Sequence, residues 1–110
     1  MDKTEIIDQI KKLVPIFSRV VNINYLVLFG SYSKGTNHKN SDIDVAIVSD
    51  NLPKGILSDE VSLALVEMHK INMDFEPHFY RTEKWENPTK DSFIDYIKKY
   101  GEVIYSNGHE

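Results

Sequence analysis

The chain has 110 residues and a formal net charge of -4, and 41% of its residues are hydrophobic. This length and composition predict one globular domain, residues 1–110, with a small but real core. The absence of cysteine excludes disulfides and thiolate metal sites. The acidic balance argues against a broad surface for long RNA or DNA, because such binding usually depends on a clustered basic patch.

The sequence shows no sign of membrane insertion or export. No apolar run approaches the roughly 18 residues that a membrane-spanning helix needs. Residues 1–5 lack the basic and apolar regions that begin a secretory signal peptide. A cytoplasmic location is therefore the default expectation.

The first half of the chain predicts one helix and two strands that flank a turn. The helix is capped by Thr4 and carries apolar residues three and four apart, and Pro15 makes its last turn doubtful. Residues 25–29 predict the first strand, and a short helix follows near residues 33–36. Residues 42–48 predict the second strand.

The second half begins with a connection, a helix and a third strand. Turn-forming residues fill positions 49–55, and a helix runs from about Ser58. In residues 71–76 apolar and polar side chains alternate, which predicts a half-buried strand. Its apolar residues, Ile71, Met73 and Phe75, are expected to face the core.

The end of the chain completes the predicted architecture. After an irregular segment, a last helix begins at Asp91 or Ser92 and ends at Gly101. A short apolar segment, residues 103–105, follows it. The order of elements predicts an α/β or α+β fold, in which helices pack on one face of a small mixed sheet.

Two aspartates, Asp42 and Asp44, stand at the start of the second predicted strand with one residue between them. Because strand side chains alternate between faces, the two carboxylates point the same way, about 6 to 7 Å apart. Like charges at that distance repel unless a cation offsets them. Oxygen ligands without cysteine favour Mg²⁺, which completes its shell with water and substrate phosphates. The pair therefore predicts a Mg²⁺ site that acts on a phosphate ester.

The turn before the aspartates fits a phosphate ligand. Gly30 follows the first strand, and glycine allows a tight turn and a close approach of the backbone to a ligand. Ser31 offers a hydroxyl and an N–H at a helix start, which is a natural anion site. Lys34 adds a positive charge, although ordinary loop polarity explains it equally well. We expect a triphosphate to dock at this turn.

These residues resemble the signature G-S-x-x-x-G…S-D-x-D of the DNA polymerase β-like nucleotidyltransferase superfamily. The matching runs are Gly-Ser-Tyr-Ser-Lys-Gly at residues 30–35 and Ser-Asp-Ile-Asp at residues 41–44. The short chain is similar to the minimal nucleotidyltransferase branch. In that family the glycine-serine turn binds the nucleoside triphosphate, the paired aspartates hold Mg²⁺, and a third carboxylate on a later strand completes the site.

The resemblance implies a polymerase β-like fold and transfer of a nucleotidyl group to an acceptor hydroxyl. Gly30, Ser31, Lys34 and Ser41 are the nucleotide-binding candidates that it carries over. One departure is Lys34, because many minimal members have arginine at this position. A lysine replaces the forked guanidinium with a point charge.

The third carboxylate is expected on the third predicted strand. Asp74 and Glu76 share the polar face of that strand, and resemblance to the family favours Asp74, while Glu76 projects the same way and stays an alternative. Two Mg²⁺ ions would then bind the attacking and leaving oxygens, with Asp42 and Asp44 shared between the ions and Asp74 on the acceptor side. The histidines show no ligand spacing, so a zinc site is not expected.

The leading hypothesis is a Mg²⁺-dependent enzyme that transfers AMP from ATP to a hydroxyl of a partner protein. The resemblance also implies a partner, since minimal nucleotidyltransferases are often encoded beside a small helical toxin of the HEPN type. The chain would then be the antitoxin of the pair. Two alternatives stay open: a non-catalytic module that neutralises a partner by contact, and a transferase that acts on a small molecule or a tRNA end.

Overall fold

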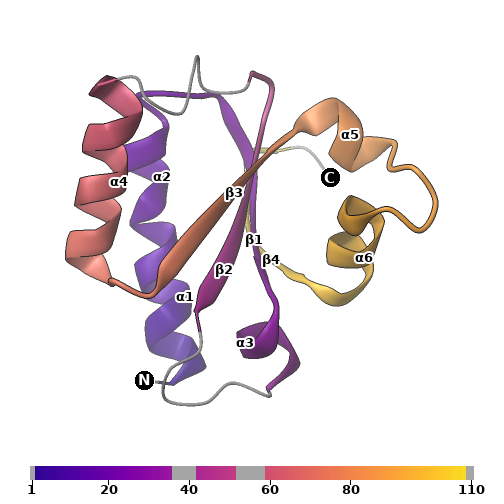
Figure 1. Ribbon diagram of the computed structural model, residues 1–110, viewed down its shortest axis with the longest axis horizontal. Coiled ribbons are helices and arrows are strands. Elements are labelled where there is room, and N and C mark those ends of the chain that lie inside the picture. Colours follow the sequence, from indigo (N-terminus) through magenta and orange to yellow (C-terminus); the bar gives the residue numbers. More distant parts are fainter. Residues whose placement is uncertain (1, 36–41, 52–58, 109–110) are drawn as a thin grey trace.

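The computed structural model describes residues 2–35, 42–51 and 59–108, which form a four-stranded sheet flanked by helices (Figure 1). The strands are β1 (Ile23–Phe29), β2 (Ile43–Ser49), β3 (Phe75–Arg81) and β4 (Glu102–Ser106). The helices are α1 (Lys3–Lys11), α2 (Leu13–Phe17), α3 (Ser31–Lys34), α4 (Asp59–Ile71), α5 (Thr82–Glu86) and α6 (Phe93–Tyr100). Over these described residues, no helix is long and apolar enough to cross a bilayer.

The sheet is mixed, with the strand order β3-β2-β1-β4. β1 runs antiparallel to both β2 and β4, and β2 runs parallel to β3. Parallel neighbours need a long crossover, and α4 lies in the segment that joins β2 to β3. β3 lies at the edge of the sheet, where Pro77 is tolerated because an edge strand needs hydrogen-bond partners on one side only. The predicted small mixed sheet is confirmed.

One face of the sheet packs against α1, α2 and α4, which lie together on the left in Figure 1. The expected first helix divides into α1 and α2 on either side of Lys12, and Pro15 lies inside α2. Asp2, rather than Thr4, caps α1: its Oδ1 accepts the Glu5 N–H at 2.9 Å. The buried residues of this core include Ile6, Ile10, Leu13, Phe17, Leu26, Leu28, Ile43, Val45, Ile47, Ala64, Met68 and Phe75.

The opposite face carries a second apolar cluster beneath α5 and α6, which lie on the right in Figure 1. Trp85 of α5 and Ile97 of α6 supply its helical side chains. The sheet contributes Tyr25, Val27, Phe29, Ala46 and Val48. Helices therefore cover one face as expected, and two short helices cover part of the other face as well, because each has a buried apolar anchor.

The third strand begins later than the sequence predicts. α4 continues to Ile71, and the next residue forms a turn, in which Asn72 Oδ1 accepts the Asp74 N–H at 2.9 Å. Met73 is 76% exposed, so its predicted place in the core is wrong. Apolar and polar residues do alternate in the sequence of this segment, but the strand itself begins at Phe75.

The predicted ends of the last helix match those of α6. Ser92 caps α6, since its Oγ accepts the Asp95 N–H at 3.2 Å, and Gly101 ends the helix. The apolar segment after it pairs with β1 as β4, and the segment predicted as irregular contains α5.

The anchor of α6 gives a test of this packing. Ile97→Ala is expected to lower the free energy of unfolding by about 2 to 5 kcal/mol, because the fully buried side chain leaves a cavity between α6 and the sheet. Urea denaturation followed by circular dichroism measures the change. Leu63→Ala on α4 is the matched control: Leu63 is 65% exposed, and its loss should cost less than about 0.5 kcal/mol. Equal losses in the two variants would contradict this packing of α6.

Candidate active site

Asp44 is the one polar side chain among the first six residues of β2, and the pairing of the strands fixes its neighbours. Ile43 and Val45 belong to the core under α1, α2 and α4, so alternation turns Asp44 toward the face that carries α5 and α6. Across the sheet, Phe29 of β1 stands opposite Asp44 on one side, and Glu76 of β3 stands opposite it on the other. A carboxylate of β2 therefore meets a carboxylate of β3 and an aromatic ring of β1.

A histidine joins the two carboxylates. One ligand atom from each of Asp44, Glu76 and His78 lies within 4.8 Å of the other two. His78 Nε2 is 3.2 Å from Asp44 Oδ1 and 3.9 Å from Glu76 Oε1. The Asp44 and His78 side chains are 25% and 28% exposed, whereas that of Glu76 is 51% exposed. These three residues, named here the Asp44 cluster, are open to solvent on the β3 side.

The turn after β1 lies against Asp44. Gly30 has φ +80°, and a β-carbon added to it would be 2.5 Å from Asp44 Oδ2. Both the backbone conformation and the space therefore require glycine. Ser31 follows as the first residue of α3. The sequence predicts that Gly30 lets the backbone approach a ligand, and the group that the structure places against Gly30 is the side chain of Asp44.

Tyr80 follows His78 on the same face of β3, outside the Asp44 cluster, and stands opposite Val48. Burial and, to a smaller extent, the negative charge of Asp44 raise the pKa of Tyr80 above its ordinary value. Since an unperturbed tyrosine already titrates near pH 10, Tyr80 keeps its proton at neutral pH. Tyr80 therefore adds no further charge to this face of the sheet.

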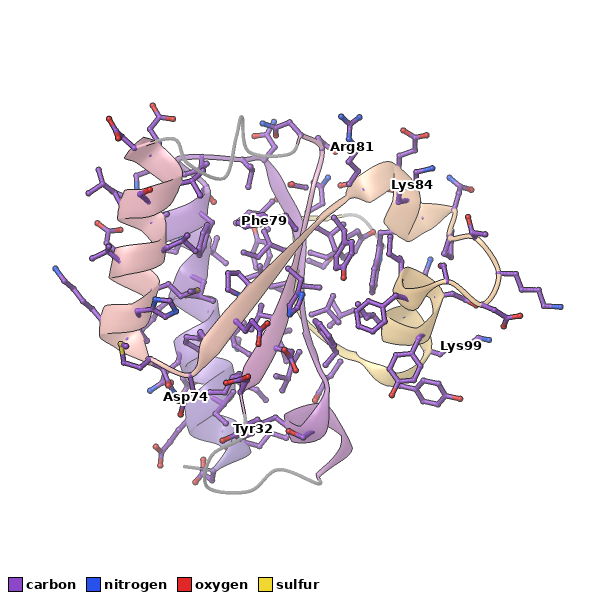
Figure 2. The ribbon with its side chains drawn as sticks, viewed as in Figure 1. Tyr32, Asp74, Phe79, Arg81, Lys84 and Lys99 are labelled. Carbon is purple, nitrogen blue, oxygen red and sulfur yellow. The ribbon has the colours of Figure 1, made fainter. Side chains whose placement is uncertain are left out.

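Asp42 and Asp74, which the sequence singles out, stand just before β2 and β3. The two chain segments are joined there, because the Ile43 N–H donates to the Asp74 carbonyl oxygen at 2.8 Å. Both aspartates are exposed, and neither belongs to the Asp44 cluster. Figure 2 labels Asp74, just before β3, and Tyr32 of α3 toward the same end of the sheet. The structure therefore places Asp74 at the same end of the sheet as the glycine-serine turn.

The other nucleotide-binding candidates are described less fully. Ser31 is half-buried at the start of α3. Lys34 ends α3, and its side chain lies outside the described part of the structure. Ser41 also lies outside the described residues.

Sequence reasoning missed His78 and left Glu76 as an alternative. The predicted third strand ends at residue 76, so His78 lies beyond it. The signal that could have found it is the spacing of Glu76 and His78, which are two apart and therefore share a face of β3. That spacing predicts a shared face only if the third strand is known to extend past residue 78.

The donor set of the Asp44 cluster suits a divalent cation. Carboxylate oxygens are the ligands that Mg²⁺ and Mn²⁺ prefer, and a neutral imidazole nitrogen adds a donor that transition metals accept. Glycine at position 30 leaves room beside Asp44 Oδ2 that any other residue would fill. The residues present therefore fit a metal-assisted reaction at a phosphate group.

Comparisons with known proteins agree with this chemistry. Residues 11–110 match the sequence family described as polymerase beta, nucleotidyltransferase. The protein adenylyltransferase MntA of Shewanella oneidensis is 40% identical over 50 residues, which cover 42% of this chain and 36% of MntA. The matched stretch thus spans about a third of that relative. A Methanocaldococcus jannaschii protein, named "Putative protein adenylyltransferase MJ0141", is 28% identical over 101 residues, covering 88% of this chain and 96% of its own length.

A solved structure has the same arrangement of elements. It is described as the crystal structure of the toxin-antitoxin with AMP-PNP, and one of its chains matches with a TM-score of 0.60 at 23% identity. The match covers 93% of the present chain and 74% of the other. At this level of identity, the likeness shows a shared fold.

The contact between Gly30 and Asp44 gives a second test. Gly30→Ala is expected to displace the Asp44 carboxylate and to weaken Mn²⁺ binding by roughly 10- to 100-fold, as loss of a ligand's supporting contacts usually does. Titration of Mn²⁺ followed by its electron paramagnetic resonance signal measures the affinity.

Gly35→Ala is the matched control for that substitution. Gly35 also has a positive φ of +74°, but a β-carbon there would meet nothing within 4 Å. Strain should destabilise both variants by about 1 to 3 kcal/mol, while Mn²⁺ affinity falls only in Gly30→Ala. Unchanged Mn²⁺ affinity in Gly30→Ala would show that the Asp44 carboxylate does not bind the ion.

Proposed function

Because the chain belongs to the polymerase β nucleotidyltransferase family, and is thus an enzyme of that class, we propose that it transfers AMP from ATP to a hydroxyl of a partner protein. Two relatives support the adenylyl group and the protein acceptor, since both are named as protein adenylyltransferases. The proposal rests on one observation: the Gly30 turn lies against Asp44. This contact brings the proposed phosphate-binding turn next to the proposed metal-binding carboxylate.

The proposed ion sites follow a row of acidic residues at one end of β2 and β3. We propose that Asp42 and Asp44 would hold the Mg²⁺ ions together with Asp74, which would serve the acceptor side. Glu76 and His78 flank Asp44 and supply further donor atoms at the inner end of the row. Bound ions of this kind neutralise charge on the transferring phosphoryl group and lower the cost of in-line displacement.

The protein's own groups position the reaction. The Gly30–Ser31 turn holds the triphosphate, with Ser41 and Lys34 as additional contacts. The acceptor hydroxyl oxygen bonds to the α-phosphorus while the bond from that phosphorus to the bridging oxygen breaks, so pyrophosphate leaves. Asp74 accepts or orients the proton of the attacking hydroxyl. Such a reaction needs alignment and charge neutralisation more than covalent chemistry by the enzyme.

We propose a small helical toxin of the HEPN type as the acceptor, with this chain as its antitoxin in the cytoplasm. The support is twofold: the signature resembles that of minimal nucleotidyltransferases, and a chain with the same fold occurs in a toxin-antitoxin structure with AMP-PNP. Modification of a hydroxyl on the toxin would then neutralise it.

Substitution of the Asp44 carboxylate tests the proposed transfer of AMP. Asp44→Asn is expected to lower AMP transfer at least about 100-fold without unfolding the domain, because the amide lacks the charge that an ion requires. The assay incubates α-labelled ATP and Mg²⁺ with host proteins and follows label on the acceptor. Asp8→Asn, an exposed change of equal charge on α1, should transfer normally. Full activity in Asp44→Asn would rule out this site.

The third carboxylate is tested by comparing two variants in the same assay. Asp74→Asn is expected to abolish transfer, whereas Glu76→Gln should reduce it less, because Asp44 and His78 still provide two donors in the Asp44 cluster. Circular dichroism checks the fold of both. The reverse order of activities would assign the third carboxylate to Glu76.

A further inference from the structure

A row of aromatic rings leads away from the Asp44 cluster. The ring of Phe29 lies 5.0 Å from that of His78 and 5.8 Å from that of Phe93, centroid to centroid, with an edge-to-face geometry in both pairs. Phe93 stacks on Tyr96 at 6.1 Å with an interplanar angle of 9°, and Tyr96 lies 5.0 Å from Tyr100. The four residues Phe29, Phe93, Tyr96 and Tyr100 are named here the aromatic row.

The aromatic row passes from the core to the surface. Phe29 is 5% exposed, whereas Phe93 is 55% and Tyr100 59% exposed. The α6 side chains of the row are three and four residues apart and therefore share one side of the helix. Ile97, four residues after Phe93, lies next to the row and anchors α6 on the sheet. The exposed rings of Phe93 and Tyr100 give this side of α6 an apolar surface, and adjoining exposed apolar side chains often mark binding sites.

The position of Phe93 indicates what this surface binds. Phe93 contacts Phe29, and Phe29 stands opposite Asp44 in the strand pair. It is therefore the first exposed ring on the path from the proposed phosphate site to α6. A nucleotide held by its phosphates at the Gly30 turn carries a flat base a short distance away. Aromatic side chains stack on every nucleobase, because each base has a π face.

The polar groups along α6 are largely paired with one another. Asp95 accepts the Asp91 N–H at 2.9 Å, and Lys99 Nζ lies 3.6 Å from Asp95 Oδ2. A hollow of about 250 Å³ is lined by these paired groups, by Ser92, and by the rings of Tyr96 and Tyr100. Stacking, rather than hydrogen bonding, is therefore the main recognition that this side of α6 offers.

We propose that the aromatic row binds the base of the nucleoside triphosphate, with Phe93 as the ring on which the base stacks. This inference rests on the proposed function, since it takes the Gly30 turn as the site of the phosphates. It adds a binding site for the base of the nucleotide, whereas the signature residues predict contacts with the phosphates only. The row fixes the base, and the turn and the carboxylates fix the phosphates.

The test compares a ligand that has a base with one that lacks it. Isothermal titration calorimetry in Mg²⁺ measures the affinities of ATP and of inorganic tripolyphosphate for the wild type and for Phe93→Ala. Phe93→Ala should bind ATP roughly 5- to 100-fold more weakly, as expected for loss of one base-stacking ring. Its affinity for tripolyphosphate should not change. Phe93→Trp retains an aromatic face and should keep most of the ATP affinity.

Two controls secure the fold. Leu63→Ala removes another exposed apolar side chain, on α4 over the opposite face of the sheet, and should bind both ligands normally. Circular dichroism and urea denaturation verify that each variant is folded. Should Phe93→Ala fail to fold, Phe93→Leu preserves apolar bulk and removes only the ring, so the same loss of ATP affinity is expected.

The outcomes separate this inference from the proposed function. If the wild type binds tripolyphosphate and ATP equally well, or if Phe93→Ala binds ATP as the wild type does, the base assignment is wrong while the phosphate site stands. If the wild type binds neither ligand, both proposals fail. If Phe93→Ala keeps its ATP affinity but transfers less label to a protein, the aromatic row contacts the acceptor and the base assignment is again wrong.

Discussion

The parallel pairing of β2 with β3 is the constraint on which the rest of the structure depends. Two parallel strands cannot be joined by a tight hairpin, so the connection needs a crossover, and α4 with α1 and α2 buries the apolar face of the sheet. Asp44, Glu76 and His78 then lie on the other face. The register sets Asp44 opposite Glu76, and a shift of one residue would place an apolar residue beside Asp44 instead.

The face that carries the Asp44 cluster has its own supports. Buried Asn24 of β1 donates through Nδ2 to Thr82 Oγ1 at 2.8 Å and to Asp50 Oδ1 at 2.6 Å, which joins the start of α5 to the sheet. Lys98 of α6 donates to the Trp85 carbonyl oxygen at 2.9 Å. These bonds hold α5 and α6 at a fixed place beside the carboxylates. A site that aligns a triphosphate needs such fixed surroundings, since small displacements of reacting groups cost large factors in rate.

The sequence predicted the parts of the molecule that local patterns control. The run of residues 25–29, the glycine turn and the paired aspartates are contiguous, and the family expectation drawn from them is confirmed. Ser92 and Gly101 likewise set the ends of α6 as predicted. The start of β3 was wrong because the same alternation fits residues 71–76 and the later strand, and only the turn at Asn72 decides between them. The approach of His78 to Asp44 and the aromatic row depend on contacts between distant segments, which periodicity does not report.

The openness of the Asp44 cluster bears on the kind of acceptor. In the described part of the chain, the carboxylates are bordered by the Gly30 turn and by the aromatic row, while the Glu76 side chain is half exposed. Nucleotidyl transfer competes with hydrolysis whenever water reaches the α-phosphate, so something must cover this side during the reaction. A small alcohol would leave most of this side of the Asp44 cluster accessible to water. Under the proposed function, a protein acceptor would bring both the hydroxyl and a surface that excludes water.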